Sequence, residues 1–220
     1  HVITQLPEPV IPPGLQRWTR DGSVEYVLSE GLQAPNDLAV APDGAVWFTD
    51  PHPVLDRETP RPGRVWRWDP SEAEPELRLD GRPHPNGLAF SPDGDALYIV
   101  ETVPRYLWRY PLRENGRQLG DGELLCTLDG EPDGVAVDVE GRVAIACHLT
   151  DEAIVVCSPE GELLERIDVE GAFATNLCFA GQELTLLAVS APRGGRVLGF
   201  EREIPGLPLP PARGPRGSDS

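Results

Sequence analysis

The chain of 220 residues is 40% hydrophobic and 25% charged, an ordinary composition for a globular protein that is long enough to bury a substantial core. It carries a formal net charge of −17, and all 19 of its basic residues are arginines. No basic stripe is available to neutralise phosphates, which argues against nucleic acid and anionic membrane surfaces as partners. The negative charge suits a divalent cation, although solubility alone also explains it.

Four cysteines occur without a Cys-x-x-Cys pair or zinc-ligand spacing, at Cys126, Cys147, Cys157 and Cys178. Each lies in an apolar run, which indicates reduced, buried thiols and favours a cytoplasmic protein. Exclusive use of arginine with abundant Pro (25) and Gly (23) suggests a bacterial source with a GC-rich genome. No apolar run reaches the length of a membrane span.

The first predicted element is a strand at residues 1–5. Because the chain contains no methionine and opens within this strand, we expect a preceding segment to be absent from it. Strands are then predicted at Leu15–Trp18 and Val24–Leu28, on either side of the turn Asp21-Gly22.

A repeat dominates the rest of the chain. Four segments share one pattern, in which a polar residue precedes a short apolar strand, a turn such as Pro-Asp-Gly, and a second apolar strand; they cover residues 34–50, 84–100, 131–147 and 174–190. Between them, further strands are predicted at Arg64–Trp68, Glu76–Leu79, Tyr106–Tyr110, Glu123–Thr127, Ala153–Cys157, Leu163–Ile167 and Arg196–Phe200. No stretch has the 3.6-residue apolar period of a helix.

This repeat predicts an all-β fold, a β-propeller made of four-stranded blades. The chain supplies about four complete blades and partial blades at both ends, within one domain at residues 1–204. Residues 205–220 are rich in Pro, Gly and Arg and are predicted to be a disordered tail. The five tryptophans lie in predicted strands, which indicates packing between blades.

The polar residue before the first strand of each repeat is the candidate for chemistry: Asn36, Asn86, Asp133 and Asn176. The first strand of every blade starts at one rim of the central channel, so we expect these side chains to converge there. Converging amide and carboxylate oxygens suit Ca²⁺ or a similar ion. Capping of tight turns is the alternative role for Asn and Asp at such positions.

The repeats contain Pro35-Asn36-Asp37, Pro85-Asn86-Gly87, Pro132-Asp133-Gly134 and Thr175-Asn176. With Trp47-Phe48-Thr49-Asp50-Pro51, their order and spacing make residues 15 to about 200 resemble the gluconolactonase, senescence-marker-protein and luciferin-regenerating-enzyme family. The resemblance implies a six-bladed propeller that holds a divalent metal in its channel and hydrolyses sugar or other lactones. Six blades of about 45 residues would place a loss of roughly 70–80 residues before His1 and a gap in the ring there.

The resemblance also implies roles for individual residues. By motif, Asn86 and Asp133 match two metal ligands. Asn36 and Asp37 match the position that contacts the substrate or, through water, the metal. Asn176, in register with them, is assigned to the substrate as well. The family's third ligand is a Glu in a Glu-Gly-Pro motif, which this chain does not contain. Ca²⁺ is the first expectation for the metal, with Zn²⁺, Mn²⁺ and Mg²⁺ as alternatives.

The implied reaction is hydrolysis of a small-molecule lactone. The metal polarises the carbonyl, and Asp133 orients or deprotonates the attacking water. No Gly-x-Ser-x-Gly motif is present for a serine nucleophile. The alternatives are a non-catalytic propeller that binds a protein or small ligand at the channel mouth, and a propeller that binds a metal and a small molecule without turnover.

Overall fold

The computed structural model describes residues 12–19 and 21–210, and these residues form strands and turns without a helix. The described part therefore contains no helix that could cross a membrane. The strands are β1 (Leu15–Trp18), β2 (Val24–Leu28), β3 (Leu38–Val40), β4 (Val46–Asp50), β5 (Pro62–Trp68), β6 (Glu76–Pro83), β7 (Pro85–Phe90), β8 (Ala96–Glu101), β9 (Tyr106–Arg113), β10 (Gln118–Leu119), β11 (Glu123–Thr127), β12 (Glu131–Val137), β13 (Val143–His148), β14 (Ala153–Cys157), β15 (Leu163–Asp168), β16 (Asn176–Ala180), β17 (Leu186–Ala191) and β18 (Arg196–Glu201).

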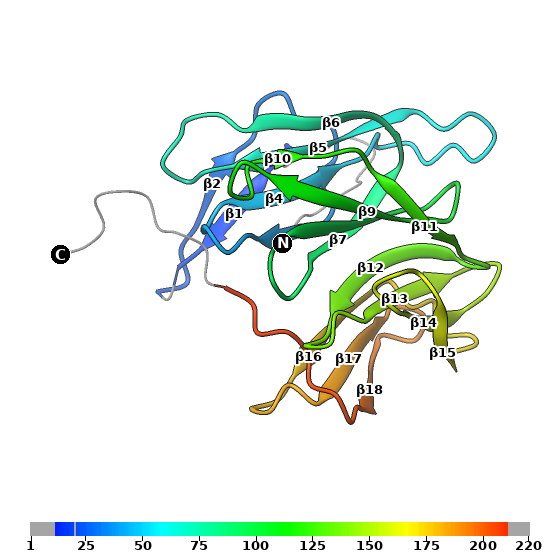
Figure 1. The fold of residues 1–220 in the computed structure, drawn as a ribbon. Helices are drawn as coiled ribbons and strands as arrows, with labels where there is room; N and C mark the ends of the chain where they lie inside the picture. Colours follow the sequence, from blue (N-terminus) through cyan, green and yellow to red (C-terminus); the bar gives the residue numbers. More distant parts are fainter. Residues whose placement is uncertain (1–11, 20, 211–220) are drawn as a thin grey trace.

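The strands form successive antiparallel sheets, arranged like the blades of a propeller (Figure 1). The first blade has the order β3-β4-β5-β6, the second β7-β8-β9-β11 with β10 on the edge of β9, the third β12-β13-β14-β15, and the fourth β16-β17-β18. The predicted propeller is confirmed. The four predicted blades are present, and the fourth has three strands in the described residues.

Tight turns set the register of the inner hairpins, as the sequence pattern predicts. Gly44, Gly94 and Gly141 have φ angles of 83°, 71° and 82°. The N–H of each donates to the carbonyl three residues earlier, for example from Gly44 to Ala41 at 2.8 Å. Glycine takes this left-handed conformation without a steric penalty, which explains its place in each turn.

The core lies between the blades. Every residue of β4, β8, β13 and β14 is buried, and apolar clusters join each blade to the next. Trp47 is fully buried between the first and second blades, where its ring meets Phe90 edge to face. Trp18 is 77% exposed, so its predicted role in packing between blades is wrong.

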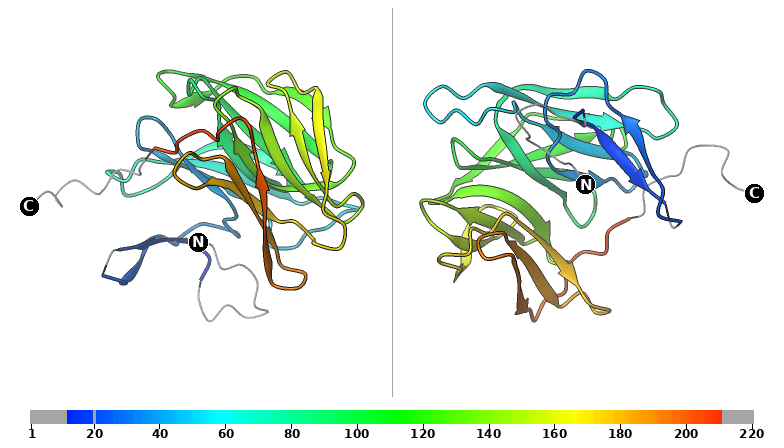
Figure 2. Two further views of the ribbon diagram at one scale, coloured as in Figure 1. Left: turned by 90° about the horizontal axis from the view of Figure 1, so that it is seen from below. Right: turned by 180° about the vertical axis from the view of Figure 1, so that it is seen from behind.

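The hairpin β1–β2 lies at the edge of the fold beside the first blade (Figure 2). Leu15 and Leu28 form one apolar cluster with Val46 and Phe48 of β4. The two predicted strands are thus present as a two-stranded sheet. The strand predicted at residues 1–5 lies outside the described residues.

The segment after β18 is hydrogen-bonded to the third and fourth blades. Gly206 N–H donates to the Leu184 carbonyl and Leu207 N–H to the Val137 carbonyl, both at 2.9 Å. The tail predicted from residue 205 onward therefore begins with a paired segment, and residues 211–220 lie outside the described part.

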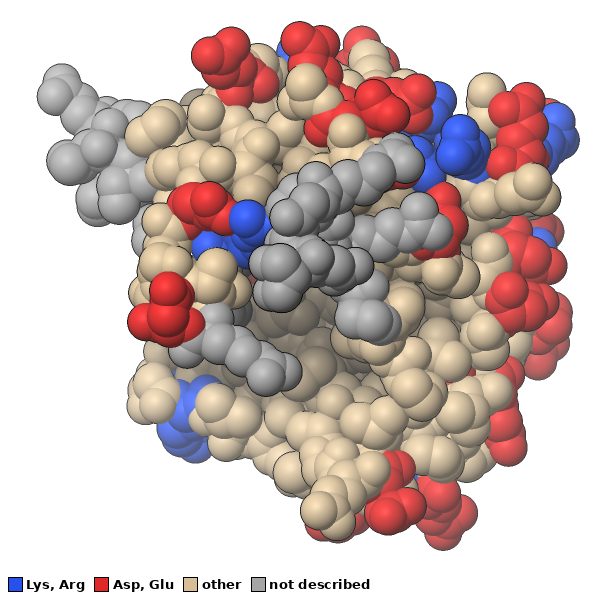
Figure 3. Space-filling view, turned by 90° about the vertical axis from the view of Figure 1, so that its left-hand side faces the viewer, with Lys and Arg blue, Asp and Glu red and all other residues tan. Residues whose placement is uncertain are grey.

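One face of the molecule has a hollow. Figure 3 shows the left-hand side of Figure 1, where the surface is hollowed near its centre and the described residues around the hollow are mostly uncharged. Asp and Glu side chains gather around the margin of this view.

Candidate active site at the start of the inner strands

The first strands of the four blades lie side by side in the order β3, β7, β12, β16. Their starting ends are in close contact. A Cβ on Gly87 would overlap the backbone carbonyl of Asp133, and a Cβ on Gly134 would lie 2.7 Å from the Cα of Asn176. The structure therefore brings Asn86, Asp133 and Asn176 to one rim, on neighbouring strands.

Backbone bulges shape this rim. In β7 the register shifts between Pro85 and Leu88, and in β12 it shifts between Pro132 and Val135. Each bulge contains one site residue followed by glycine. A bulge re-aims side chains that strict strand alternation would send to opposite faces. The alternation of apolar and polar residues along the sequence does not reveal these bulges.

Asn86 is 4% exposed, and its amide has a defined orientation. Its Nδ2 donates to Thr102 Oγ1 at 3.0 Å, and the Thr102 hydroxyl donates to the Pro132 carbonyl at 2.9 Å. The single hydroxyl proton of Thr102 is used on Pro132, so Thr102 accepts from Asn86. Asn86 Oδ1 is left buried without a hydrogen-bond partner.

Asp133 lies beside a buried histidine. Its Oδ2 is 3.5 Å from His148 Nε2, and His148 Nδ1 is 4.0 Å from a carboxylate oxygen of Glu131. His148 Nδ1 has no hydrogen-bond partner. The three side chains come from paired strands, because Glu131 stands opposite His148 in the β12–β13 ladder.

An arginine and an aromatic ring complete the surroundings of His148. Arg57, in the loop between β4 and β5, donates two hydrogen bonds to Glu131 at 2.7 and 2.9 Å. Phe173 stacks on the His148 ring at a centroid distance of 4.6 Å, and the guanidinium of Arg193 lies 5.4 Å from the Phe173 centroid. These contacts join residues far apart in sequence, and the repeat pattern did not indicate them.

Asp37 stands where the second and third blades have the bulge glycines. Its Oδ2 accepts from Leu88 N–H on the next blade at 3.3 Å, and its Oδ1 accepts from Leu38 N–H at 2.9 Å. Burial raises the pKa of Asp37 to about 7; the two backbone hydrogen bonds oppose this shift, and the negative charge of Asp133 adds to it. Asp37 is thus half protonated near neutral pH.

The remaining predicted residues differ in exposure. Asn36 is half-buried, and its backbone N–H donates to the Thr49 carbonyl at 2.9 Å. Asn176 is exposed, and its Oδ1 accepts from Leu177 N–H at 2.7 Å. This local hydrogen bond is the capping role that the sequence left open for Asn at such positions.

His84 approaches the same rim from the turn before β7, with a φ angle of 55°. Burial lowers its pKa to about 4, and the charge of Arg57 contributes to the shift, while Glu131 opposes it. His84 is therefore neutral at physiological pH. From the sequence, His84 could either line the rim or be an ordinary loop residue, because it stands two residues before Asn86.

The donor atoms at the rim fit a hard cation in part. The unpartnered Oδ1 of Asn86 and the carboxylate of Asp133 are oxygen ligands of the kind that Ca²⁺ prefers. Within residues 12–19 and 21–210, no group of three or more His, Cys, Asp and Glu side chains is arranged to hold a metal ion. The described residues thus offer a partial ligand set.

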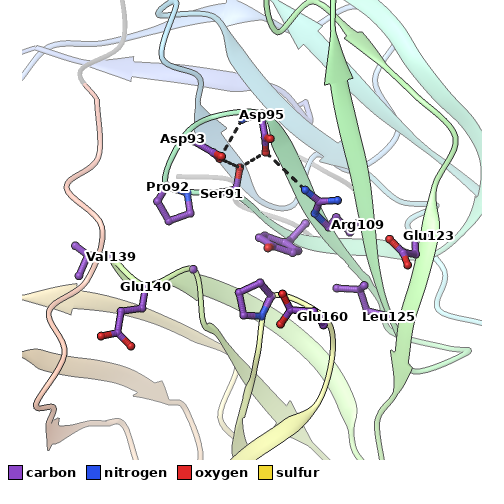
Figure 4. A pocket seen from close by; sticks show the side chains of 13 residues that line it. Ser91, Pro92, Asp93, Asp95, Arg109, Glu123, Leu125, Val139, Glu140 and Glu160 are labelled. Atoms are coloured by element: carbon purple, nitrogen blue, oxygen red, sulfur yellow. Dashed lines mark hydrogen bonds and ion pairs between the residues drawn. The ribbon is translucent and has the colours of Figure 1, made fainter.

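A separate cavity of about 470 Å³ lies at the other end of the strands, where the turns of the second and third blades meet (Figure 4). Ser91 Oγ donates toward Asp93 and Asp95 at 2.7 and 3.1 Å, and Arg109 pairs with Asp95 at 3.7 Å. None of the predicted site residues lines this cavity.

The sequence profile described as "SMP-30/Gluconolactonase/LRE-like region" matches residues 13–193. This match covers most of the chain and agrees with the propeller architecture described above. The chain therefore belongs to the SMP-30/gluconolactonase/LRE-like family, which confirms the resemblance found in the sequence.

Individual curated proteins are similar to the chain over more than half of its length. The chain is 32% identical over 165 residues to the 6-deoxy-6-sulfogluconolactonase of Pseudomonas putida, a match that covers 73% of the chain and 55% of that protein. It is 34% identical over 135 residues to the protein strictosidine synthase-like 13 of Arabidopsis thaliana, covering 57% of the chain and 33% of that protein. The chain thus spans about a third to a half of the curated relatives that it matches here.

A solved structure supports the fold. The gluconolactonase of Xanthomonas campestris superposes with a TM-score of 0.69 at 31% sequence identity, covering 90% of this chain and 65% of that one.

Proposed function

We propose that this chain belongs to a metal-dependent hydrolase that opens a lactone ring, with its reaction site at the rim formed by β3, β7, β12 and β16. Asp133 is the catalytic carboxylate, Asn86 and Asp133 bind a divalent cation, with Ca²⁺ as the first choice, and Asn36, Asp37 and Asn176 contact the substrate. The relatives named as lactonases support the reaction class.

One observation carries the proposal. Asn86 Oδ1 is buried without a hydrogen-bond partner, while the other end of the same amide is fixed by Thr102. A buried carbonyl oxygen without a partner lowers the stability of a fold by about 1–3 kcal/mol, so this arrangement does not contribute to stability. A cation held between Asn86 and Asp133 would satisfy this oxygen.

Asn86 and Asp133 would hold such a cation, which would supply polarisation of the lactone carbonyl and stabilisation of the charge that develops on its oxygen. The side chains of this protein supply the remaining parts of the proposed mechanism. The Asp133 carboxylate accepts the proton of the attacking water. His148, 3.5 Å away and held by its stack on Phe173, fixes the orientation of that carboxylate. Asp37, whose pKa burial raises, would contact a polar group of the substrate.

The proposal is tested by pH-stat hydrolysis of glucono-1,5-lactone with Ca²⁺, after subtraction of the spontaneous rate. We expect Ca²⁺-dependent turnover that falls at least 100-fold in the Asp133→Ala variant, as is usual for loss of a general base. Asp93→Asn, at the opposite end of the strands, is the matched control and should keep full activity. Equal rates in both variants would contradict the proposed role of Asp133. Ca²⁺ binding without turnover would instead favour the non-catalytic alternative.

A further inference from the structure

Two thiols meet across the interface between the second and third blades. Cys126 lies on β11, the outer strand of the second blade, and Cys157 is the last residue of β14 in the third blade. Their sulfur atoms are 4.0 Å apart. At this distance the two thiols are in direct contact. A disulfide needs a separation of about 2.05 Å, so the two side chains have to rotate toward each other to form one.

The surrounding contacts hold the two strands close. A Cβ on Gly161, in the turn after Cys157, would lie 2.7 Å from the side chain of Leu125, the neighbour of Cys126. Cys126 also packs against the apolar cluster that contains Cys157 and Cys147. The short distance between the thiols therefore belongs to a packed interface between two blades, with a glycine where a side chain would clash.

The two cysteines differ in access. Cys126 is half-buried and Cys157 is 2% exposed, so an oxidant reaches Cys126 first. The hydrogen bond from Cys157 lowers the pKa of the Cys126 thiol, and the same contact raises the pKa of Cys157. The accessible thiol is thus also the one that loses its proton more readily, which is typical of an oxidation-sensitive cysteine.

We propose that Cys126 and Cys157 form a reversible disulfide that links the second and third blades when the protein meets hydrogen peroxide. The Cys126 thiolate attacks one peroxide oxygen, forming a sulfenic acid and releasing hydroxide. The Cys157 sulfur then attacks the sulfenic sulfur, an S–S bond forms, and the Cys157 proton leaves with the hydroxyl group as water. Two thiols are oxidised and one peroxide is reduced to two water molecules, counting the proton that the first thiol released.

The linked blades carry Asn86 and Asp133 on their inner strands, so the disulfide would fix the relative position of the two blades. Closing a loop of about 30 residues constrains the unfolded chain and stabilises the folded one. We expect the melting temperature to rise by roughly 5–10 °C on oxidation. This inference does not depend on the proposed lactone hydrolysis.

The test treats the 220-residue chain, in a Cys178→Ser background, with a small molar excess of hydrogen peroxide. Free thiols are then counted after denaturation and disulfides are mapped by mass spectrometry without reduction. We expect two of the three remaining thiols to disappear, one cross-linked peptide pair containing Cys126 and Cys157, and a rise in melting temperature that dithiothreitol reverses. The Cys126→Ser variant should keep both remaining thiols and an unchanged melting temperature.

Two results would overturn the proposal. One is a disulfide from Cys126 to the fully buried Cys147. The other is conversion of Cys126 to sulfinic or sulfonic acid without any cross-link, which would mean that Cys157 does not reach the sulfenic acid in time.

Discussion

The side-chain nitrogen of Asn86 donates to the hydroxyl of Thr102, and this contact determines that the amide oxygen of Asn86 is the atom left without a partner. Thr102 in turn donates to the carbonyl of Pro132, the residue before Asp133. One hydroxyl therefore joins the second blade to the third beside Asn86 and Asp133, the two residues proposed to bind a cation.

Replacing Thr102 with valine tests this link, because valine keeps the shape of the side chain and removes the hydroxyl. We expect Ca²⁺ affinity to fall about tenfold, equivalent to about 1.4 kcal/mol, since the Asn86 amide is then free to turn. Titration calorimetry measures the change. Thr102→Ser keeps the hydroxyl and should bind as tightly as the wild type; equal loss in both variants would mean that the methyl packing matters instead.

A methyl group at Gly87 should destabilise the fold. It would overlap the Asp133 carbonyl across the blade interface, so we expect Gly87→Ala to lower the free energy of unfolding by about 1–3 kcal/mol in urea titrations. Gly199→Ala is the matched control on β18, where the nearest atom would be 3.2 Å away on the flexible side chain of Leu186. Similar losses at both positions would contradict close packing of the inner strands.

Asp37 should make stability depend on pH between about 4 and 7. Its folded-state pKa of about 7 lies above the value of 3.8 expected in the unfolded chain, so the folded state binds the proton more tightly. Its contribution to stability is present below pH 4 and is lost as the pH rises through 7. Urea unfolding from pH 4 to 8 should show a smaller decline for Asp37→Asn than for the wild type. Asp121→Asn, at an exposed position, should follow the wild-type curve.

Arg57 should hold the loop between β4 and β5 against the third blade. Glu131 is 9% exposed at its side chain and loses its two charge-assisted hydrogen bonds in Arg57→Ala. A double-mutant cycle with Glu131→Gln should give a coupling free energy of about 1 kcal/mol in thermal or urea unfolding. Additive effects of the two changes would show that the pair contributes nothing to stability.

The strands were predictable because their signals are local. Turns such as Asp43-Gly44 and Asp93-Gly94 place a residue of positive φ between two apolar runs, and the predicted outer strands match the observed ones within a few residues. The prediction that Trp18 packs between blades failed, because a strand assignment does not say which face of an edge hairpin another sheet covers. Burial there depends on neighbours that the pattern of one strand does not contain.

The rim was predictable only in outline. The repeat placed Asn86, Asp133 and Asn176 at equivalent positions, and the structure brings them to neighbouring strands. The repeat could not show that Asn176 is exposed and hydrogen-bonded to the backbone of the next residue, or that Thr102 orients Asn86. These facts depend on side-chain rotamers, on bulges and on contacts between residues in different blades.

The most direct test of the account is calorimetric titration of Ca²⁺ into the wild-type chain and into the variants Asn86→Ala, Asp133→Asn and Asp93→Asn. The account predicts one binding event in the wild type, its loss or a weakening of at least tenfold in the first two variants, and no change in Asp93→Asn. Asp93 belongs to the acidic cavity at the far end of the strands, so it controls for general loss of negative charge. Binding of equal strength in Asn86→Ala, Asp133→Asn and the wild type would contradict a cation site at this rim.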